Sequence, residues 1–85
     1  MKSFRYTITD ETGIHARPAG LLVKEARKYK SRIRIKSGEK SVEATGLMAV
    51  MGLGIACGQT VEILVEGEDE QMAVAGMEQF FKRNL

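Results

Sequence analysis

The sequence predicts an α+β fold in which strands and helices follow the order βαββαβα and the helices cover one face of an open sheet. Two patterns lead to this prediction. Apolar residues alternate with polar ones in the segments expected to form strands, and they recur every three or four residues in those expected to form helices. A chain of 85 residues builds only one core, so residues 1–85 are expected to form a single domain.

The strands are predicted from period-two alternation. Segments 4–8 and 61–65 place an apolar residue at every second position, and residues 32–36 do the same around two isoleucines. Ser-Gly-Glu at 37–39 indicates a turn into a short fourth strand centred on Val42. Many of the intervening residues are charged, so one face of the sheet is expected to be open to water.

The helices are predicted from apolar residues on one side of a helical turn. Residues 19–26 have this spacing, and Pro18 belongs in the first turn of that helix, where no amide hydrogen is needed. Residues 73–81 repeat the spacing after an acidic start. Residues 47–53 are expected to form a short third helix that is too apolar to bury every side chain.

The composition argues against several classes of protein. A net charge of +2 is too small to indicate nucleic-acid binding, and no apolar run approaches the ~20 residues that cross a bilayer. The N-terminus lacks a secretion signal, so a cytoplasmic protein is expected. One histidine and one cysteine are too few for a zinc site, and no cofactor is expected. Cys57 is expected to be buried or incidental rather than reactive.

Candidate chemistry lies in residues 13–19, Gly-Ile-His-Ala-Arg-Pro-Ala, where the only histidine precedes a helix. The first amides of a helix lack partners and favour an anion, so Ala16 and Arg17 could bind a phosphate held on His15. The same positive end favours a neutral imidazole with a free nitrogen lone pair, and Arg17 offers a planar fork for phosphate oxygens. The alternative is that His15 is a solvated side chain at a helix start and Arg17 a surface cation.

Residues 13–19 resemble the active-centre signature of the HPr family, the histidine-containing phosphocarriers of the bacterial phosphoenolpyruvate-dependent sugar phosphotransferase system. Residues 47–56 resemble the family's short interaction helix, and residues 67–70 resemble the start of its last helix. The resemblance covers essentially the whole chain. It implies an HPr-like open-faced β-sandwich with a four-stranded antiparallel sheet and three helices on one face.

The resemblance also implies a function. His15 would accept a phosphoryl group on Nδ1 from phosphorylated enzyme I and pass it to IIA domains of sugar transporters, with Arg17 beside the phosphate. The protein would be a monomeric stoichiometric carrier, not an enzyme, and would bind neither nucleic acid nor a membrane. Val50 and Leu53 would point inward. The implied partner-binding residues are Ala16, Gly20, Lys24, Arg27, Leu47, Met48 and Met51.

Two readings of this surface stay open. Lys24 and Arg27 would also suit a plain solvated helix face, and apolar residues at helical spacing more often belong to a core.

Many HPr proteins carry a regulatory serine where this chain has Gly46, and neither Thr45 nor Ser41 matches that motif. The role of the Leu85 carboxylate is also left open.

Two other functions compete with the carrier. An HPr-like regulatory paralogue would act through protein binding by the 47–53 surface, although such a protein would not need His15, Arg17 and Pro18. A nucleic-acid binder would use the basic segment 32–36, but Phe4 and Tyr6 are expected in the core, which leaves no exposed aromatic platform.

Overall fold

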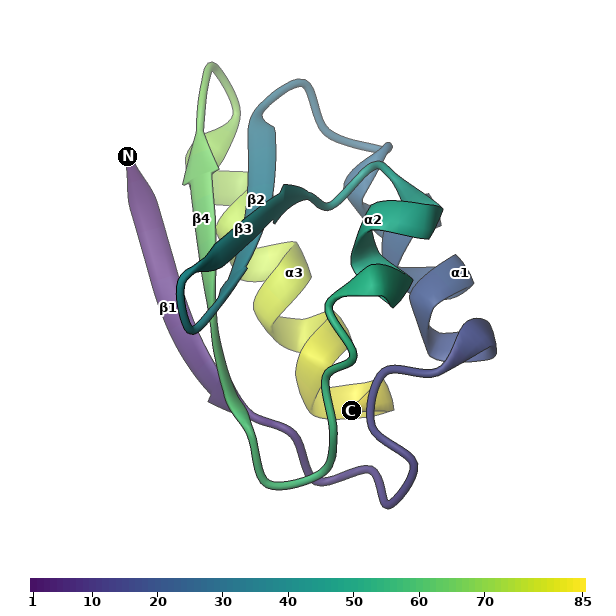
Figure 1. Cartoon of the computed structure of the whole chain (residues 1–85). Helices are drawn as coiled ribbons and strands as arrows, with labels where there is room; N and C mark the ends of the chain where they lie inside the picture. The colour runs from purple at the N-terminus through teal and green to yellow at the C-terminus, as the bar shows by residue number, and fades with distance from the viewer.

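The computed structural model describes all 85 residues and confirms the predicted order of elements. The strands form a four-stranded antiparallel sheet in the order β1-β4-β2-β3, and the helices lie on one face of it (Figure 1). The elements are β1 (Lys2–Thr7), α1 (Ala16–Ala26), β2 (Arg32–Ser37), β3 (Lys40–Glu43), α2 (Leu47–Gly52), β4 (Thr60–Glu66) and α3 (Glu70–Asn84).

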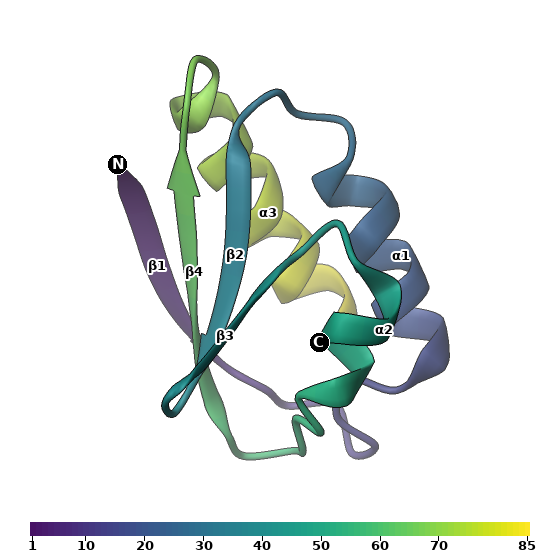
Figure 2. The same ribbon diagram turned by 45° about the horizontal axis from the view of Figure 1, so that its top comes forward.

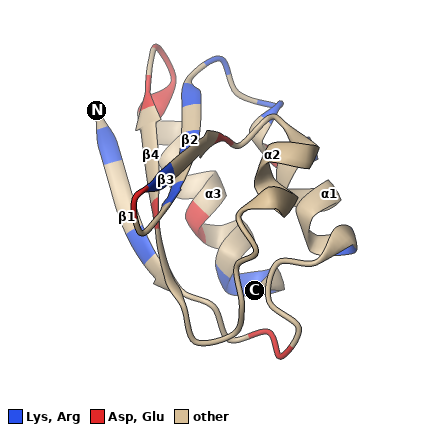
Figure 3. Ribbon diagram, in the orientation of Figure 1, with Lys and Arg blue, Asp and Glu red and all other residues tan.

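The outer face of the sheet carries charged residues of both signs, as the alternation predicted. In the sheet register Glu62 lies between Arg5 on one side and Lys36 on the other. Arg32 forms an ion pair with Glu43, with 2.7 Å between its Nη2 and the carboxylate Oε2. Blue and red segments are accordingly mixed along the strands in Figure 3. Opposite charges on neighbouring strands suit a face that stays in water.

The inner face of the sheet packs against α1 and α3, which run side by side across it (Figure 2). Phe81 is fully buried, and its ring meets the rings of Phe4 and Tyr6 edge-on, with centroid distances of 5.8 and 5.5 Å. Such edge-to-face pairs are a favoured aromatic geometry. Phe4 and Tyr6 therefore belong to the core region, as predicted. None of the three helices is long and apolar enough to cross a membrane.

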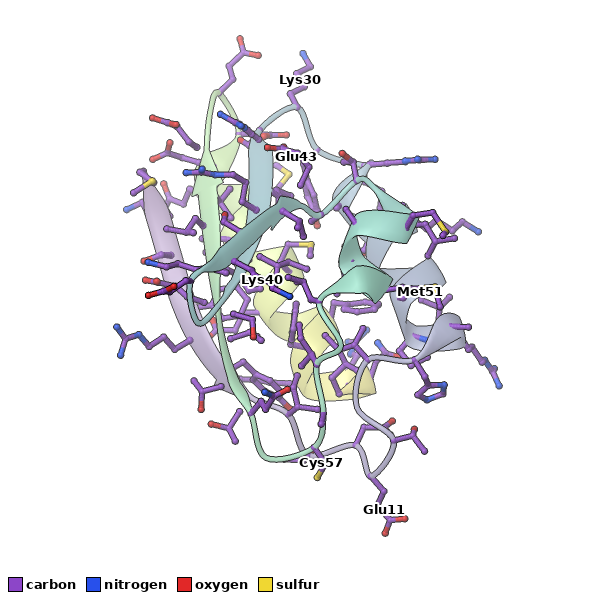
Figure 4. The ribbon with its side chains drawn as sticks, in the orientation of Figure 1. Glu11, Lys30, Lys40, Glu43, Met51 and Cys57 are labelled. Atoms are coloured by element: carbon purple, nitrogen blue, oxygen red, sulfur yellow. The ribbon has the colours of Figure 1, made fainter.

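The short helix α2 ends at Gly52, one residue before the predicted end. Val50 is buried and Leu53 is half-buried against the core, so both point inward as expected. Cys57 was expected to be buried or incidental, and the structure excludes the first of these two alternatives. Its thiol is exposed in the loop before β4, where its sulfur lies 3.7 Å from the carbonyl oxygen of Thr9 (Figure 4).

Asp69, at the start of α3, connects that helix to the segment before β2. Its carboxylate accepts hydrogen bonds from the amides of Lys30 and Ser31 and from the Ser31 hydroxyl. These bonds favour the ionised form, and the bond from the Ser31 side chain is the main reason that the pKa of Asp69 lies below its ordinary value. The carboxylate therefore stabilises the fold in its charged state.

We expect Asp69→Asn to destabilise the protein at pH 7 and to matter less as the pH falls. Because the pKa of Asp69 is lower in the folded than in the unfolded chain, its contribution is complete above the ordinary value of 3.8. It is lost as the pH falls through the lowered folded value. Urea unfolding at pH 7 and near pH 3 measures this, with the exposed neighbour Glu68→Gln as the control. If the free energies of unfolding of Asp69→Asn and wild type differed equally at both pH values, the stabilising role of the ionised carboxylate would be contradicted.

Candidate functional site

His15 stands where the loop after β1 enters α1. It is the N-cap residue, with extended backbone (φ −93°, ψ −171°) and an exposed side chain. The first helical bond runs from the amide of Ala19 to the carbonyl of His15, at 2.9 Å. The amides of Ala16 and Arg17 have no acceptor, and Pro18 has no N–H to offer. Two free donors at the positive end of the helix therefore stand beside the imidazole.

His15 and Arg17 line the same shallow cavity of about 270 Å³. Both residues are exposed, so the imidazole and the guanidinium border this cavity from the surface of the protein. The cavity also contains three side chains that were not predicted, namely Asp10, Leu21 and Asn84. They come from the loop before α1, from α1 itself and from the last turn of α3.

The loop before His15 is fixed on one side by close packing on residues 55–56. Gly13 has φ +69°, a conformation that favours glycine. A Cβ added there would collide with the carbonyl oxygen of Ile55, to which the next amide, that of Ile14, donates a hydrogen bond of 3.0 Å. Glycine is therefore required at position 13 for two reasons, the positive φ and the close contact with the backbone of Ile55.

The same loop is fixed on its other side by the end of α3. A main-chain carboxylate oxygen of Leu85 accepts hydrogen bonds from the amides of Thr9 and Asp10, at 2.6 and 2.9 Å, and from the Thr9 hydroxyl, at 2.9 Å. The Leu85 side chain is buried. Leu85 thus acts on the loop through its main chain, whereas Asn84 lines the cavity itself.

Asp10 is oriented by Thr12, two residues later. Its Oδ1 accepts hydrogen bonds from the Thr12 amide, at 2.9 Å, and from the Thr12 hydroxyl, at 2.8 Å. These bonds, the amide bond first, lower the pKa of Asp10, and the charge of His15 adds a smaller effect in the same direction. Asp10 is therefore a carboxylate held in its ionised form within electrostatic reach of His15.

A second surface lies beside the histidine, across α1 and α2. We call it the α1–α2 face. Its members on α1 are spaced to lie on one side of the helix, and they are exposed except for Gly20, which is half-buried. Met48 is 80% exposed, which is unusual for a methionine and marks the most accessible apolar group of α2. The face comprises Ala16, Gly20, Lys24, Arg27, Leu47, Met48 and Met51.

Arg27 connects the two helices of this face. Its Nη2 donates a hydrogen bond of 2.9 Å to the carbonyl oxygen of Thr45, just before α2. A shallow cavity of about 310 Å³ lies between the helices and is lined in part by Gly20, Lys24 and Leu47. The predicted partner residues are thus brought together on one surface, and Figure 3 shows that the α2 ribbon carries no charged residue.

Sequence reasoning missed Asp10 and Asn84. Asp10-Glu11-Thr12 did carry a local signal, because an aspartate two residues before a hydroxyl residue favours a turn held by its own side chain. Nothing local marks Asn84. It reaches the cavity only because α3 packs beside α1, with its last turn near the β1–α1 loop.

Comparison with known proteins gives consistent matches over nearly the whole chain. Residues 2–83 match the family described as the PTS HPr component phosphorylation site. The phosphocarrier protein HPr of Lysinibacillus sphaericus is 41% identical over 73 residues, which are 86% of this chain and 83% of that protein. HPr-C-His from Thermoanaerobacter tengcongensis is 36% identical with a TM-score of 0.94, and the match covers 99% of this chain and 94% of that one. The catabolite repression containing protein Crh of Bacillus subtilis is 30% identical with a TM-score of 0.78, over 100% and 98% of the two chains.

We expect Gly13→Ala to lower the free energy of unfolding by more than about 2 kcal/mol. About 1 kcal/mol comes from the left-handed backbone and roughly 1–3 kcal/mol from the collision with Ile55. Gly38→Ala is the control, because Gly38 has a similar φ of +62° with no atom near an added Cβ, so only the backbone cost applies. Urea unfolding of both variants gives the comparison, and equal losses would contradict the packing role of Gly13.

Proposed function

The chain belongs to the HPr family of the phosphotransferase system, and from this premise we propose that His15 accepts a phosphoryl group from one protein and yields it to another. The supporting observation is the exposed imidazole at the start of α1, which shares one cavity with Arg17 and has the free amides of Ala16 and Arg17 beside it. The protein is a stoichiometric carrier, and the phosphohistidine is the form that is handed on.

The transfer is an exchange of one N–P bond for another. The lone pair on Nδ1 of a neutral His15 attacks phosphorus while the donor's N–P bond breaks, and the electron pair of that bond stays on the donor imidazole. The donor ring carries a proton on its other nitrogen, so it leaves as a neutral imidazole. His15 keeps its proton on Nε2, so the ring's positive charge passes from donor to acceptor and no separate base is needed. Delivery runs the same step in reverse, with the acceptor protein's nucleophile attacking.

The geometry suits a group that must leave again. Arg17 and the amides of Ala16 and Arg17 can orient phosphate oxygens, while the cavity stays shallow and open to the partner's attacking atom. A deep site that enclosed the phosphate would hold it and exclude the acceptor. The carrier therefore supplies orientation, and the partner completes the reaction.

We assign the α1–α2 face to the partners, which we propose are phosphorylated enzyme I and the IIA domains. Leu47, Met48 and Met51 form an exposed apolar centre, and Lys24 and Arg27 stand on its α1 side. An apolar centre with charged neighbours is the usual composition of a protein interface, and the cations would steer acidic partners. Methionine adapts to more than one partner. We propose that the protein is a monomer, since this face then stays uncovered, and that it acts in the cytoplasm.

A regulatory paralogue is the second candidate, and the match to Crh favours it. His15, Arg17 and Pro18 favour the carrier, because regulation by binding alone does not require them. Gly46 bears on the same question, since it has no hydroxyl and cannot be phosphorylated. A Cβ added at Gly46 would lie 3.5 Å from that of Ala49, an ordinary contact, so packing does not demand glycine there. Residue 46 of this chain therefore cannot be phosphorylated.

Incubation with enzyme I and phosphoenolpyruvate should add one acid-labile phosphoryl group to the protein, visible in an intact-mass spectrum. His15→Ala should add none, because His15 is the only histidine in the chain and no other imidazole can carry the group. Arg17→Lys should still be phosphorylated, but about tenfold more slowly, because an ammonium cannot replace the planar fork. A wild-type protein that gains no mass, or a His15→Ala variant that gains it equally, would refute the carrier function.

The partner surface is tested by placing a charge at its most exposed apolar residue. We expect Met48→Asp to slow phosphorylation by enzyme I at least about tenfold, by adding a desolvation cost at an interface centre. Met72→Asp is the matched control, since Met72 is 69% exposed on α3, outside the α1–α2 face. Initial rates at limiting carrier concentration measure both. Equal rates for the two variants would place the interface elsewhere.

A further inference from the structure

A carboxylate shares the cavity with the histidine. Asp10 lines the cavity together with His15 and Arg17, yet it forms no ion pair with any cation. A site that only bound phosphate would be expected to have no carboxylate in its lining, because like charges repel. Asp10 thus brings a negative charge to the cavity in which the phosphoryl group would lie.

The position of Asp10 is fixed at two points. Its amide donates to a main-chain carboxylate oxygen of Leu85, and its Oδ1 accepts two hydrogen bonds from Thr12. Its Oδ2 takes part in no hydrogen bond within the chain. The carboxylate is thus held in place and ionised, and one of its oxygens is unpaired beside the phosphorylation site.

We propose that Asp10 opposes the phosphoryl group on His15 and thereby sets how readily that group is transferred. This inference rests on the proposed function of His15 and deepens it. Arg17 and the free amides of Ala16 and Arg17 attract the phosphoryl oxygens, and Asp10 repels them. The balance keeps the phosphorylated form from becoming too stable to deliver its group.

The size of the effect follows from charge interactions across a solvated cavity. A carboxylate and a phosphoryl group of nearly two negative charges, lining the same cavity near water, repel enough to shift an equilibrium about threefold to tenfold. Because both groups are near solvent, salt should reduce this shift. A threefold to tenfold change is small for a binding affinity. It is large for the phosphorylation equilibrium of a carrier that must both accept and deliver its group.

The test is Asp10→Asn, which removes the charge and keeps an amide oxygen that can accept both Thr12 bonds. Glu11→Gln is the matched control, since it removes the same charge one residue away, from an exposed side chain that points away from the body of the protein (Figure 4). Each protein is phosphorylated chemically with phosphoramidate, and the loss of phosphohistidine is followed by phosphorus NMR. Each is also equilibrated with enzyme I at a fixed ratio of phosphoenolpyruvate to pyruvate.

We expect Asp10→Asn to raise the ratio of phosphorylated to free carrier about threefold to tenfold and to slow the hydrolysis of the phosphohistidine by a similar factor. Glu11→Gln should match wild type in both assays, and the effect of Asp10→Asn should shrink in 1 M salt, where the Debye length is only about 3 Å. A merely structural role for Asp10 would not produce this salt dependence.

The proposal is overturned if Asp10→Asn behaves as Glu11→Gln in both assays. If Asp10→Asn does not fold, Asp10→Ser replaces it, because its hydroxyl can also accept from Thr12. Failure of enzyme I to phosphorylate any of the proteins would refute the proposed function instead. The hydrolysis comparison after chemical phosphorylation would still decide the role of Asp10.

Discussion

The site depends on one constraint, the two-sided fixing of the loop that leads from β1 into α1. On one side Gly13 packs against the backbone of Ile55, and on the other the main-chain carboxylate of Leu85 accepts hydrogen bonds from the amides of Thr9 and Asp10. Neither contact involves the reactive group. Together they determine where α1 begins, and hence that His15 is its N-cap with free amides immediately after it. A small protein can thus hold an exposed side chain in place without burying it.

The electrostatics of the cavity follow from this placement. The helix start and Arg17 make one side of it positive, while Asp10, brought in by the same loop, makes the other side negative. Figure 3 shows red on the tip of this loop and blue at the start of α1. A site with only the positive elements would be a phosphate-binding site. A carrier is better served by opposed charges, since it gains nothing from retaining its group.

Much of the fold could be predicted from the sequence, because each strand and helix buries one face and so repeats its apolar residues with its own period. The alternation around Ile33 and Ile35 and the helical spacing of residues 19–26 gave the right elements for this reason. Burial of Cys57 could not be decided from the sequence, because a single apolar residue in a loop has no period from which burial can be predicted. His15 and Arg17 could be selected because they are local to one helix start. Asn84 could not be predicted in this way, because it lines the cavity only through the packing of α3 on α1.

The helices of the α1–α2 face differ in how strongly they are held, and this difference bears on partner binding. α1 is buried along one whole side, whereas α2 is six residues long and buries only Val50. Its first turn has no side-chain cap at Gly46, and Arg27 reaches across from α1 to bind the carbonyl just before it. A helix this short is not stable by itself, so its position depends on Val50, on the half-buried Leu53 and on that one cation. The rigid helix therefore presents the reactive group, while the weakly held helix presents the adaptable methionines. Under the function we propose, this division lets one face fit several partners without moving His15.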